Sequence, residues 1–327
     1  MPKKINKFNY FNKEEKGCTL YSYNEVLNGG YYIVANYPDL EIEKDFTVVD
    51  STLNAIIMLN PNVDLKLNEK SIIATSKRGR YTGKYVENKF SILNKQYTNS
   101  CMLNLDVLNK ASSFASTNEK KPILTGVNID ENGKVVATDS FKVYRYSSEG
   151  NGVENPSSIT ISTSLIKTAY ALFNNKNIQV EYNVSSVCMK DENIMLVGNL
   201  LTGDFPKIDI IFNQINGEGC EINKNELLDA IGFTKIAGAN IDIKKVPLYA
   251  TLGNGKYIGE ADEKFEKEID YNGAEVVFDA LFLETTLKAF DNEKVIIHTL
   301  KKERGSMSKF GIENNPNEEI VLLGIAK

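Results

Sequence analysis

The stretch SITISTSLIKTAYALFNNKNIQVEY, residues 158–182, has a pattern that returns further along the chain as AEVVFDALFLETTLKAFDNEKVIIHT, residues 274–299. Both segments are typical of a strand, a polar helix cap, a short helix, a Phe-Asx-Asn turn and a second strand. The offset between the two copies is 117 residues, from Phe173 to Phe290. A third copy, FTVVDSTLNAIIMLNPNVDLKL, begins at Phe46 at nearly the same spacing upstream. One supersecondary unit therefore occurs three times.

A second helix in each of the two later copies keeps the same offset. LDVLNKASSFAS, residues 105–116, precedes Ala137-Thr138-Asp139 in the way that ELLDAIGFTKIAG, residues 226–238, precedes Glu260-Ala261-Asp262. The second and third domains therefore each contain two β-α-β-β-β halves. The expected helices span residues 105–115, 164–173, 225–238 and 280–290, with Asn104, Thr163, Asn223 and Asp279 as polar caps.

Asn-Gly pairs indicate that hairpins connect many of the remaining segments. They stand at residues 28–29, 132–133, 254–255 and 272–273, mostly between short Val/Ile/Tyr-rich runs. Asn-Gly favours the two-residue turn of an antiparallel hairpin. The expected fold class is α+β, with three similar domains of antiparallel sheets and short helices. We place these domains at residues 1–96, 97–214 and 215–327.

The first domain is shorter than the other two. Counting back one offset from the helix at Leu105 runs off the N-terminus, so this domain is expected to lack its first helix. It would open instead with the strand KFNYF, the hairpin KEEKG and the strands CTLYSYN and GYYIVAN, within residues 7–36.

Composition places the chain among soluble globular proteins. Of its 327 residues, 42% are hydrophobic and 25% are charged, and no apolar run approaches the roughly 20 residues of a membrane helix. The start, MPKKINKFNYFNKEEKG, lacks the apolar centre of a secretion signal, so we expect a cytoplasmic protein.

The cysteines Cys18, Cys101, Cys188 and Cys220 form no CxxC, which favours reduced core thiols. A net charge of −5 argues against a conventional DNA binder but permits DNA inside a locally basic hole.

A catalytic role finds little support in the residues. His298, the single histidine, lies in the strand-like run VIIHT, which favours a structural role over a place in a histidine-based triad or a His-Cys metal cluster. GNGKYIG, from Gly253, joins two apparent strands with no helix after it, which favours a hairpin over a phosphate loop. The acidic run GEADEKFEKEID alternates like a solvated strand face. We therefore expect no catalytic residues, no metal and no cofactor.

Three segments carry a resemblance to a known family. ASSFASTNEKKPILTGVNIDENGKVVATDSFKVYRYS, residues 111–147, contains a PIL-x-G segment and then an ATD-x-x-[KR] segment. GNLLTGDFPKIDIIF, residues 198–212, is similar to a G-x-[FY]-P-D-[YF] boundary, with Asp209 shifted from the usual acidic position. The last strand, IVLLGIAK, also fits. Residues 104–327 thus resemble the β subunit of bacterial DNA polymerase III, the sliding clamp family, and the first hundred residues fit it by pattern.

The resemblance implies a DNA clamp fold, in which two chains join head to tail and helices line a central hole inside the sheets. A closed collar of this kind would encircle duplex DNA without reading its sequence, and it would serve a DNA polymerase and a clamp loader. Loss of the first helix would leave five lining helices per chain rather than six. The ring interface would join Arg80, Tyr81 and Gly83 to Ile236 and Ala237.

The family also binds short hydrophobic peptides of its partners between the second and third domains. The corresponding positions here are Leu124, Thr138, Phe141, Lys142, Val143, Pro206, Ile210, Ile211, Leu322, Leu323 and Ile325. Any one of them is equally compatible with a place in the core. Phe141-Lys142 stands where a His-Arg pair is common, Ile210 where an arginine can occur, and the tail ends Gly-Ile-Ala-Lys. We therefore expect a more apolar and less charged groove.

Lysines on or beside the predicted helices are candidates for contact with DNA phosphates. Such contacts give weak, salt-sensitive attraction that suits sliding. They are Lys110, Lys120, Lys121, Lys167, Lys224, Lys235 and Lys288. Ordinary solvated lysines are the alternative, and Glu226, Asp229 and Glu284 on the same helices weaken the signal.

Two rival functions remain open at this point. One is a clamp-fold adaptor or structural protein that does not encircle DNA. The other is a metal-dependent enzyme acting on nucleic acid, for which the sequence supplies no ordered motif.

Overall fold

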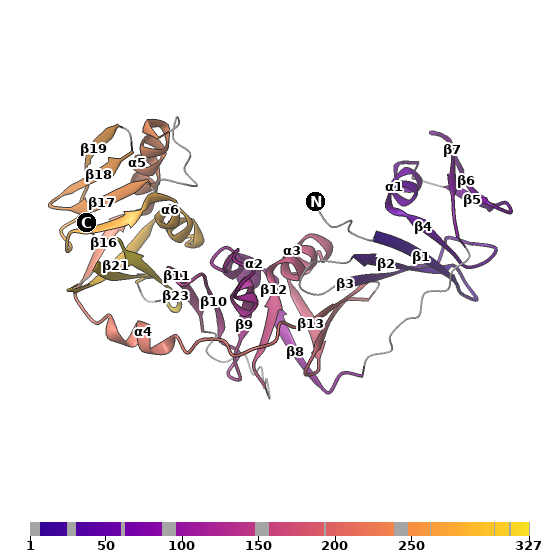
Figure 1. Ribbon diagram of the computed structural model, residues 1–327, viewed down its shortest axis with the longest axis horizontal. Helices are drawn as coiled ribbons and strands as arrows, with labels where there is room; N and C mark the ends of the chain where they lie inside the picture. Colours follow the sequence, from indigo (N-terminus) through magenta and orange to yellow (C-terminus); the bar gives the residue numbers. More distant parts are fainter. Residues whose placement is uncertain are drawn as a thin grey trace. The chain divides into compact units, whose positions relative to one another are not determined.

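The computed structural model describes residues 7–24, 31–59, 63–86, 96–147, 157–192, 194–238, 248–261, 263–303, 305–313 and 315–326. The chain divides into two compact units, Met1–Leu105 with Ser164–Thr202, and Asp106–Thr163 with Gly203–Lys327. Both are built mainly from antiparallel sheets with short helices, as the hairpin signals predict. Figure 1 shows the ribbon and the labels of its helices and strands.

The first unit contains an eight-stranded and a three-stranded antiparallel sheet. The larger sheet has the order β4-β1-β2-β3-β15-β14-β13-β8, and the smaller has the order β5-β6-β7. The elements are β1 (Lys7–Lys13), β2 (Cys18–Asn24), β3 (Tyr31–Tyr37), β4 (Phe46–Val49), α1 (Asp50–Met58), β5 (Asp64–Leu67), β6 (Ser71–Ser76), β7 (Gly79–Lys84), β8 (Asn99–Asn104), α3 (Thr163–Leu172), β13 (Asn177–Tyr182), β14 (Ser186–Lys190) and β15 (Ile194–Asn199).

The strands predicted within residues 7–36 are confirmed. The three opening strands are β1 to β3, and no helix precedes α1 among the described residues. A core beneath α1 holds this part together, since Phe46 and Ile72 are fully buried and the rings of Phe11 and Phe46 stack at 4.7 Å. Burying each such side chain stabilises the fold by about 1.5–3 kcal/mol.

The second unit contains an eight-stranded sheet, β12-β9-β10-β11-β23-β22-β21-β16, and a four-stranded sheet, β19-β18-β17-β20. The elements are α2 (Leu105–Ser112), the 3-10 helix η1 (Pro122–Thr125), β9 (Gly126–Ile129), β10 (Val135–Thr138), β11 (Lys142–Tyr146), β12 (Ile159–Ser162), α4 (Asp209–Gln214), β16 (Gly219–Asn223), α5 (Lys224–Ala237), β17 (Tyr249–Gly253), β18 (Lys256–Glu260), β19 (Lys264–Glu268), β20 (Val276–Asp279), α6 (Ala280–Ala289), β21 (Lys294–Lys302), β22 (Gly305–Ile312) and β23 (Asn315–Gly324).

The four helices expected from the repeat are present as α2, α3, α5 and α6, with ends that differ by at most three residues. Two predicted caps are confirmed: Asn223 accepts a hydrogen bond from the Glu226 amide, and Asp279 accepts from the Leu281 and Phe282 amides. Thr163 is not a cap, because α3 begins at this residue. The short helix α4 was not predicted.

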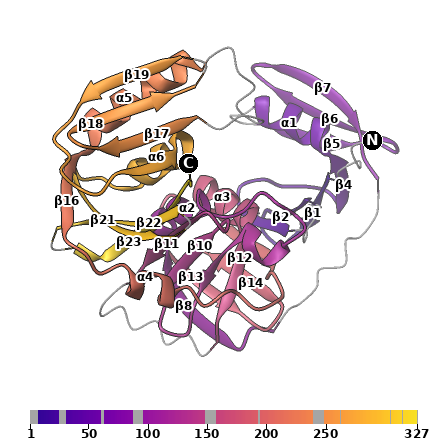
Figure 2. The ribbon, with the colours of Figure 1, turned by 60° about the vertical axis from the view of Figure 1, so that its left-hand side comes forward.

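A close approach fixes α5 on its sheet. Thr234 of α5 lies against Gly259 of β18, where a Cβ would overlap the threonine side chain. The Thr234 hydroxyl lies 2.7 Å from the hydroxyl of the buried Tyr257. Figures 1 and 2 both show α5 beside β18 and β19. The glycine therefore sets the distance between helix and sheet.

The run GNGKYIG is a hairpin, as predicted. It joins β17 to β18, and Asn254 and Gly255 both have positive φ, 51° and 71°, as a type I′ turn requires. The Asn28-Gly29 pair lies outside the described residues. None of the helices in the described ranges combines the length and the apolar character needed to cross a bilayer.

Candidate functional site

The turn between β10 and β11 presents an aromatic side chain to solvent. Asp139 Oδ1 accepts hydrogen bonds from the amides of Phe141 and Lys142, both at 2.9 Å, and Ser140 has a positive φ of 83°. This tight turn leaves Phe141 58% exposed, with its ring 6.1 Å from that of Phe282 on α6. A large apolar side chain held outward by a well-bonded turn suits contact with a partner.

Lys142 turns inward instead. Its side chain is buried, its ammonium forms an ion pair with Asp139, and that ammonium lies 4.9 Å from the ring centroid of Phe282 and 5.7 Å from that of Phe114. An ammonium paired and covered in this way offers little charge to a partner. The surface around Phe141 is therefore mainly apolar.

The segment that contains α4 adds a second exposed apolar residue. Ile210 is 63% exposed, while Ile208 and Phe212 on either side of it are buried against Val143 of β11 and Val321 of β23. Phe212 thus packs inward from α4, while Ile210 remains exposed to solvent.

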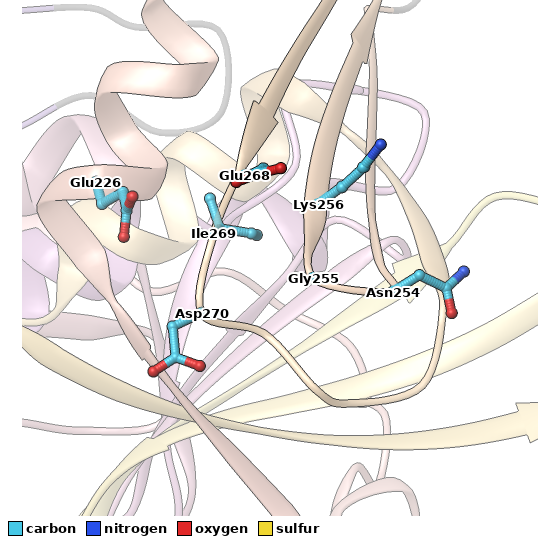
Figure 3. Close-up of a pocket in the computed structure, with 7 residues that line it drawn as sticks. All are labelled: Glu226, Asn254, Gly255, Lys256, Glu268, Ile269 and Asp270. Carbon is cyan, nitrogen blue, oxygen red and sulfur yellow. The ribbon is translucent and has the colours of Figure 1, made fainter.

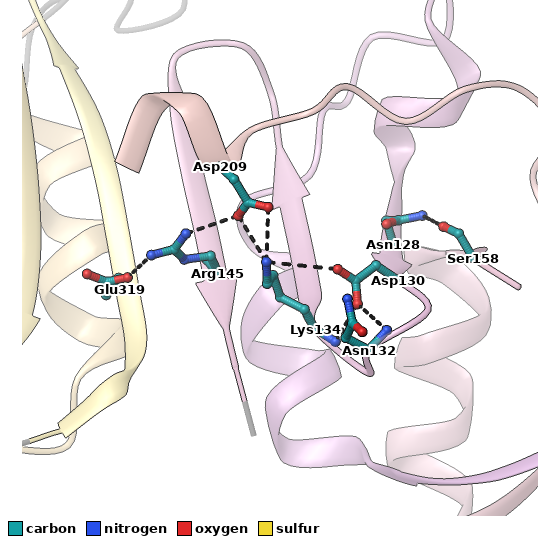
Figure 4. A network of polar contacts seen from close by, with 8 residues as sticks. All are labelled: Asn128, Asp130, Asn132, Lys134, Arg145, Ser158, Asp209 and Glu319. Carbon is teal, nitrogen blue, oxygen red and sulfur yellow. Dashed lines mark hydrogen bonds and ion pairs between the residues drawn. The ribbon is translucent and has the colours of Figure 1, made fainter. Parts of the chain in front are cut away.

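A polar cluster fastens α4 to the sheet (Figure 4). The Asp209 carboxylate forms ion pairs with Lys134 Nζ and with Arg145 Nη1, both at 3.0 Å. The Arg145 guanidinium lies 3.9 Å from the ring centroid of Phe212 and also forms an ion pair with Glu319 of β23. Partial burial alone would raise the pKa of the Asp209 carboxyl, but the hydrogen bonds and charges of Lys134 and Arg145 leave that pKa below its usual value.

We expect Asp209→Asn to loosen α4. Loss of two partly exposed ion pairs should raise hydrogen exchange of amides in α4 about threefold or more at neutral pH. Because the folded-state pKa of Asp209 is depressed, this stabilisation is present above the unfolded-state pKa and is lost as pH falls through the folded-state value. Wild type and variant should therefore converge in strong acid. Asp204→Asn, at an exposed position of the same segment, is the control; equal exchange in both variants would contradict the role of Asp209.

The last strand completes this region. Leu322 is fully buried opposite Lys142 in the β11–β23 ladder. The Leu323 amide donates to the Phe141 carbonyl at 2.9 Å, and the Ile325 amide donates to the Val277 carbonyl at 2.7 Å. The C-terminal strand thus joins the Phe141 turn to β20 within one unit.

The predicted groove residues fall into two groups, all within the second unit. The buried group, which can only support a surface, is Leu124, Thr138, Lys142, Val143 and Leu322. The group that is exposed or half-buried is Phe141, Pro206, Ile210, Ile211, Leu323 and Ile325. We call this second group the apolar patch. Phe282 beside Phe141 was missed, because its position on a helix gave no signal that distinguished it from core.

Most of the predicted DNA-facing lysines have partners within the chain. Lys110 lies 3.0 Å from Glu318 and 3.4 Å from Asp291, and the Lys224 ammonium donates to the Phe290 carbonyl at the end of α6 at 2.8 Å. Both Lys235 and Lys288 bind Glu284. These four lysines are thus paired within the chain, and their contact with DNA phosphates stays a prediction. Lys120, Lys121 and Lys167 have no recorded side-chain partner in the described ranges.

The predicted ring-interface residues lie at two exposed places, one in each unit. Arg80, Tyr81 and Gly83 belong to β7, one of the two outer strands of the three-stranded sheet. Ile236, which is 71% exposed, and Ala237 end α5. Beside them the exposed Phe233 stacks on Phe265 of β19, the outer strand of the four-stranded sheet, at 4.9 Å. The sequence gave no indication of this aromatic pair.

The charges of the two outer strands differ. Residues 77–84, around β7, contain the exposed bases Lys77, Arg78, Arg80 and Lys84 and no acid. Residues 263–270, around β19, contain the exposed acids Glu263, Glu266, Glu268 and Asp270 against Lys264 and Lys267. One edge is therefore basic and the other is acidic.

An open pocket lies at the Asn254-Gly255 turn (Figure 3). Its lining includes Glu226 of α5, Lys256 of β18, and Glu268 and Asp270 at the end of β19. Glu226 is paired with Lys267 at 3.3 Å. In the described part of the chain, no group of three acidic, histidine or cysteine side chains is arranged to hold a metal. His298 Nδ1 lies 2.7 Å from the Gly217 carbonyl in a structural contact.

The two units consist mainly of antiparallel sheets with short helices, and the residues of the apolar patch all belong to the second unit. No protein-family model matches the chain. The β sliding clamp of Streptococcus pneumoniae is 23% identical over 215 residues, covering 61% of this chain and 56% of that protein. The β sliding clamp of Staphylococcus aureus is 23% identical over 237 residues, covering 67% and 60%. The matches thus span a little over half the length of these curated relatives.

The structural matches extend over nearly the whole chain. A crystal structure of the DNA polymerase III β chain from Streptococcus pneumoniae matches with a TM-score of 0.80 at 17% identity, covering 98% of this chain and 92% of that one. A sliding clamp from Bartonella birtlesii bound to griselimycin matches with a TM-score of 0.81 at 15% identity, covering 98% and 91%. The DNA clamp fold and the resemblance to the sliding clamp family of polymerase III β subunits are confirmed.

Proposed function

We propose that the protein is a DNA sliding clamp, a non-enzymatic processivity factor that encircles duplex DNA and holds a replicative polymerase through the apolar patch. The observation that carries this proposal is the clamp fold, which matches solved clamps over 98% of the chain. A topological link needs no strong attraction to DNA, which is compatible with a net charge of −5. Such a protein would act in the cytoplasm together with a clamp loader.

We propose further that two copies close the ring head to tail. Each chain offers a basic outer strand, β7, and an acidic outer strand, β19, and each strand has one side without a partner strand in the described sheets. Pairing β7 of one copy with β19 of the other would give the backbone N–H and C=O groups of both edges hydrogen-bond partners, and it would bring opposite charges together. Such a contact joins two different surfaces of the chain, and two copies that each offer both surfaces can close into a ring. The domain division at residues 96 and 214 remains part of this proposal.

Retention on DNA of different topology tests the proposal. With a polymerase and a loader on a primed circular template, the protein should lengthen the products. After loading it should stay with circular DNA through gel filtration and leave once the circle is cut, since a ring slides off an end. Equal retention on linear and circular DNA would contradict encirclement.

A clamp-fold adaptor that does not encircle DNA is the second candidate. The pairing of Lys110, Lys224, Lys235 and Lys288 within the chain favours it, because it reduces the charge offered to DNA. Sedimentation equilibrium separates the two candidates. A species of twice 36.5 kDa supports the ring, and a monomer at all concentrations supports the adaptor.

A further inference from the structure

Two lysines from neighbouring helices converge on one carboxylate. Lys235 Nζ of α5 lies 3.0 Å from Glu284 Oε2, and Lys288 Nζ of α6 lies 2.7 Å from Glu284 Oε1. The side chains of Lys235 and Lys288 are 43% and 61% exposed, whereas that of Glu284 is 18% exposed. The ammonium groups are therefore open to solvent around a more enclosed acid.

Glu284 is ionised at neutral pH. Burial would raise the pKa of its carboxyl, but the hydrogen bonds and charges of Lys288 and Lys235 lower that pKa overall. The three side chains together carry one positive charge rather than two. Two ammonium groups that share one oxyanion also form a suitable arrangement for a phosphate oxygen.

We propose that Glu284 is a built-in competitor that weakens the contact which Lys235 and Lys288, two of the predicted DNA-facing lysines, make with a phosphate of the DNA backbone. The inference rests on the proposed function, because it takes the nucleic acid threaded through a clamp as the ligand. When a phosphate binds, the two ammonium groups exchange the Glu284 carboxylate for the phosphate oxygen. The gain in affinity is then smaller than for two lysines without a partner, and fewer solution ions are released.

The number of lysines on Glu284 supports this role over simple helix bracing. Glu284 needs only Lys235 to join α6 to α5. Lys288 lies on the same helix as Glu284, in the i,i+4 relation, and adds a second ammonium that this joining does not require. Lys110 and Lys224 are similarly occupied by internal acceptors. The internal pairing of these lysines would weaken any contact with DNA, and the Glu284 pair is the one in which two exposed ammonium groups share a single carboxylate.

The test compares Glu284→Gln with wild type in binding to a short fluorescent linear duplex across a salt series. Releasing two exposed ion pairs should raise affinity between about twofold and tenfold at low salt. The slope of log affinity against log salt should steepen by up to about 0.9 for each lysine freed. Adding Lys235→Gln and Lys288→Gln to the variant should cancel both gains.

Glu221→Gln is the matched control. It makes the same change of charge and frees Lys294, which is paired with Glu221 at 2.6 Å on neighbouring sheet strands. An affinity and slope for Glu284→Gln equal to those of wild type, or of this control, would overturn the inference. A fall in thermal stability without a gain in DNA affinity would likewise assign Glu284 to helix bracing.

The inference and the proposed function fail in different experiments. The duplex assay needs no ring closure or loader, so it judges the two lysines even if the protein is an adaptor. Wild-type protein that stays on circular DNA while Glu284→Gln shows no gain in the duplex assay would leave the clamp intact and remove only the competitor role.

Discussion

Reversing the charge of the β7 edge is expected to split the proposed dimer into monomers. In Arg80→Glu with Lys84→Glu, two exposed bases of one edge become acids that would face the acidic β19 edge of the other copy. A two-chain ring contains two copies of this interface, so each substitution weakens both of them. Like charges across an interface cost several kcal/mol, so the dimer dissociation constant measured by sedimentation equilibrium should rise about a hundredfold or more.

A mixing experiment makes this prediction specific for head-to-tail pairing. Glu266→Lys with Glu268→Lys reverses the other edge and should also give monomers. When the two variants are mixed, each interface of a mixed ring joins either two native edges or two reversed edges, so dimers should return. An interface of β7 with β7 would instead leave the Glu266→Lys with Glu268→Lys variant dimeric on its own, because its β7 edge is native. Lys120→Glu with Lys121→Glu changes the charge equally at exposed positions of the second unit and should remain dimeric.

Sequence patterns predicted the elements better than their partners. The helices α5 and α6 were placed because Asn223 and Asp279 are strong caps before amphipathic runs, and those caps form the expected bonds. The strand pairs β3–β15 and β11–β23 were not predicted, since they join segments far apart in the chain. The helix α4 was also missed, because six residues are too few to show a helical period.

The orientation of charged side chains was the weakest part of the prediction. Lys142 was placed in the groove by the family resemblance, but Asp139 and the rings of Phe114 and Phe282 cover its ammonium. The lysines of α5 and α6 were predicted to face DNA or solvent, and the ion pairs of two of them with Glu284 were not predicted. Such pairs depend on the relative placement of two helices, which a single sequence does not reveal.

The apolar patch provides the last prediction, the capture of a partner peptide. Phe141→Ala and Ile210→Asp should each weaken binding of a hydrophobic polymerase peptide, and together they should lower its affinity about a hundredfold, measured by calorimetry. An aromatic anchor lost from an interface costs about 2 kcal/mol or more, and a carboxylate buried under an apolar peptide adds a desolvation cost. Both side chains are more than half exposed in the free protein, so the melting temperature should stay near that of wild type.

The buried charge of Lys142 also predicts how peptide binding depends on salt. Because the Lys142 ammonium is paired and buried, the peptide should be held by apolar contact, and its affinity should change little with salt. Duplex DNA binding should weaken steeply over the same range. Val184→Asp, at a 97% exposed position in the first unit, is the control and should leave peptide affinity unchanged. Unchanged affinity in the Phe141 and Ile210 variants would place the peptide site on another surface of the protein.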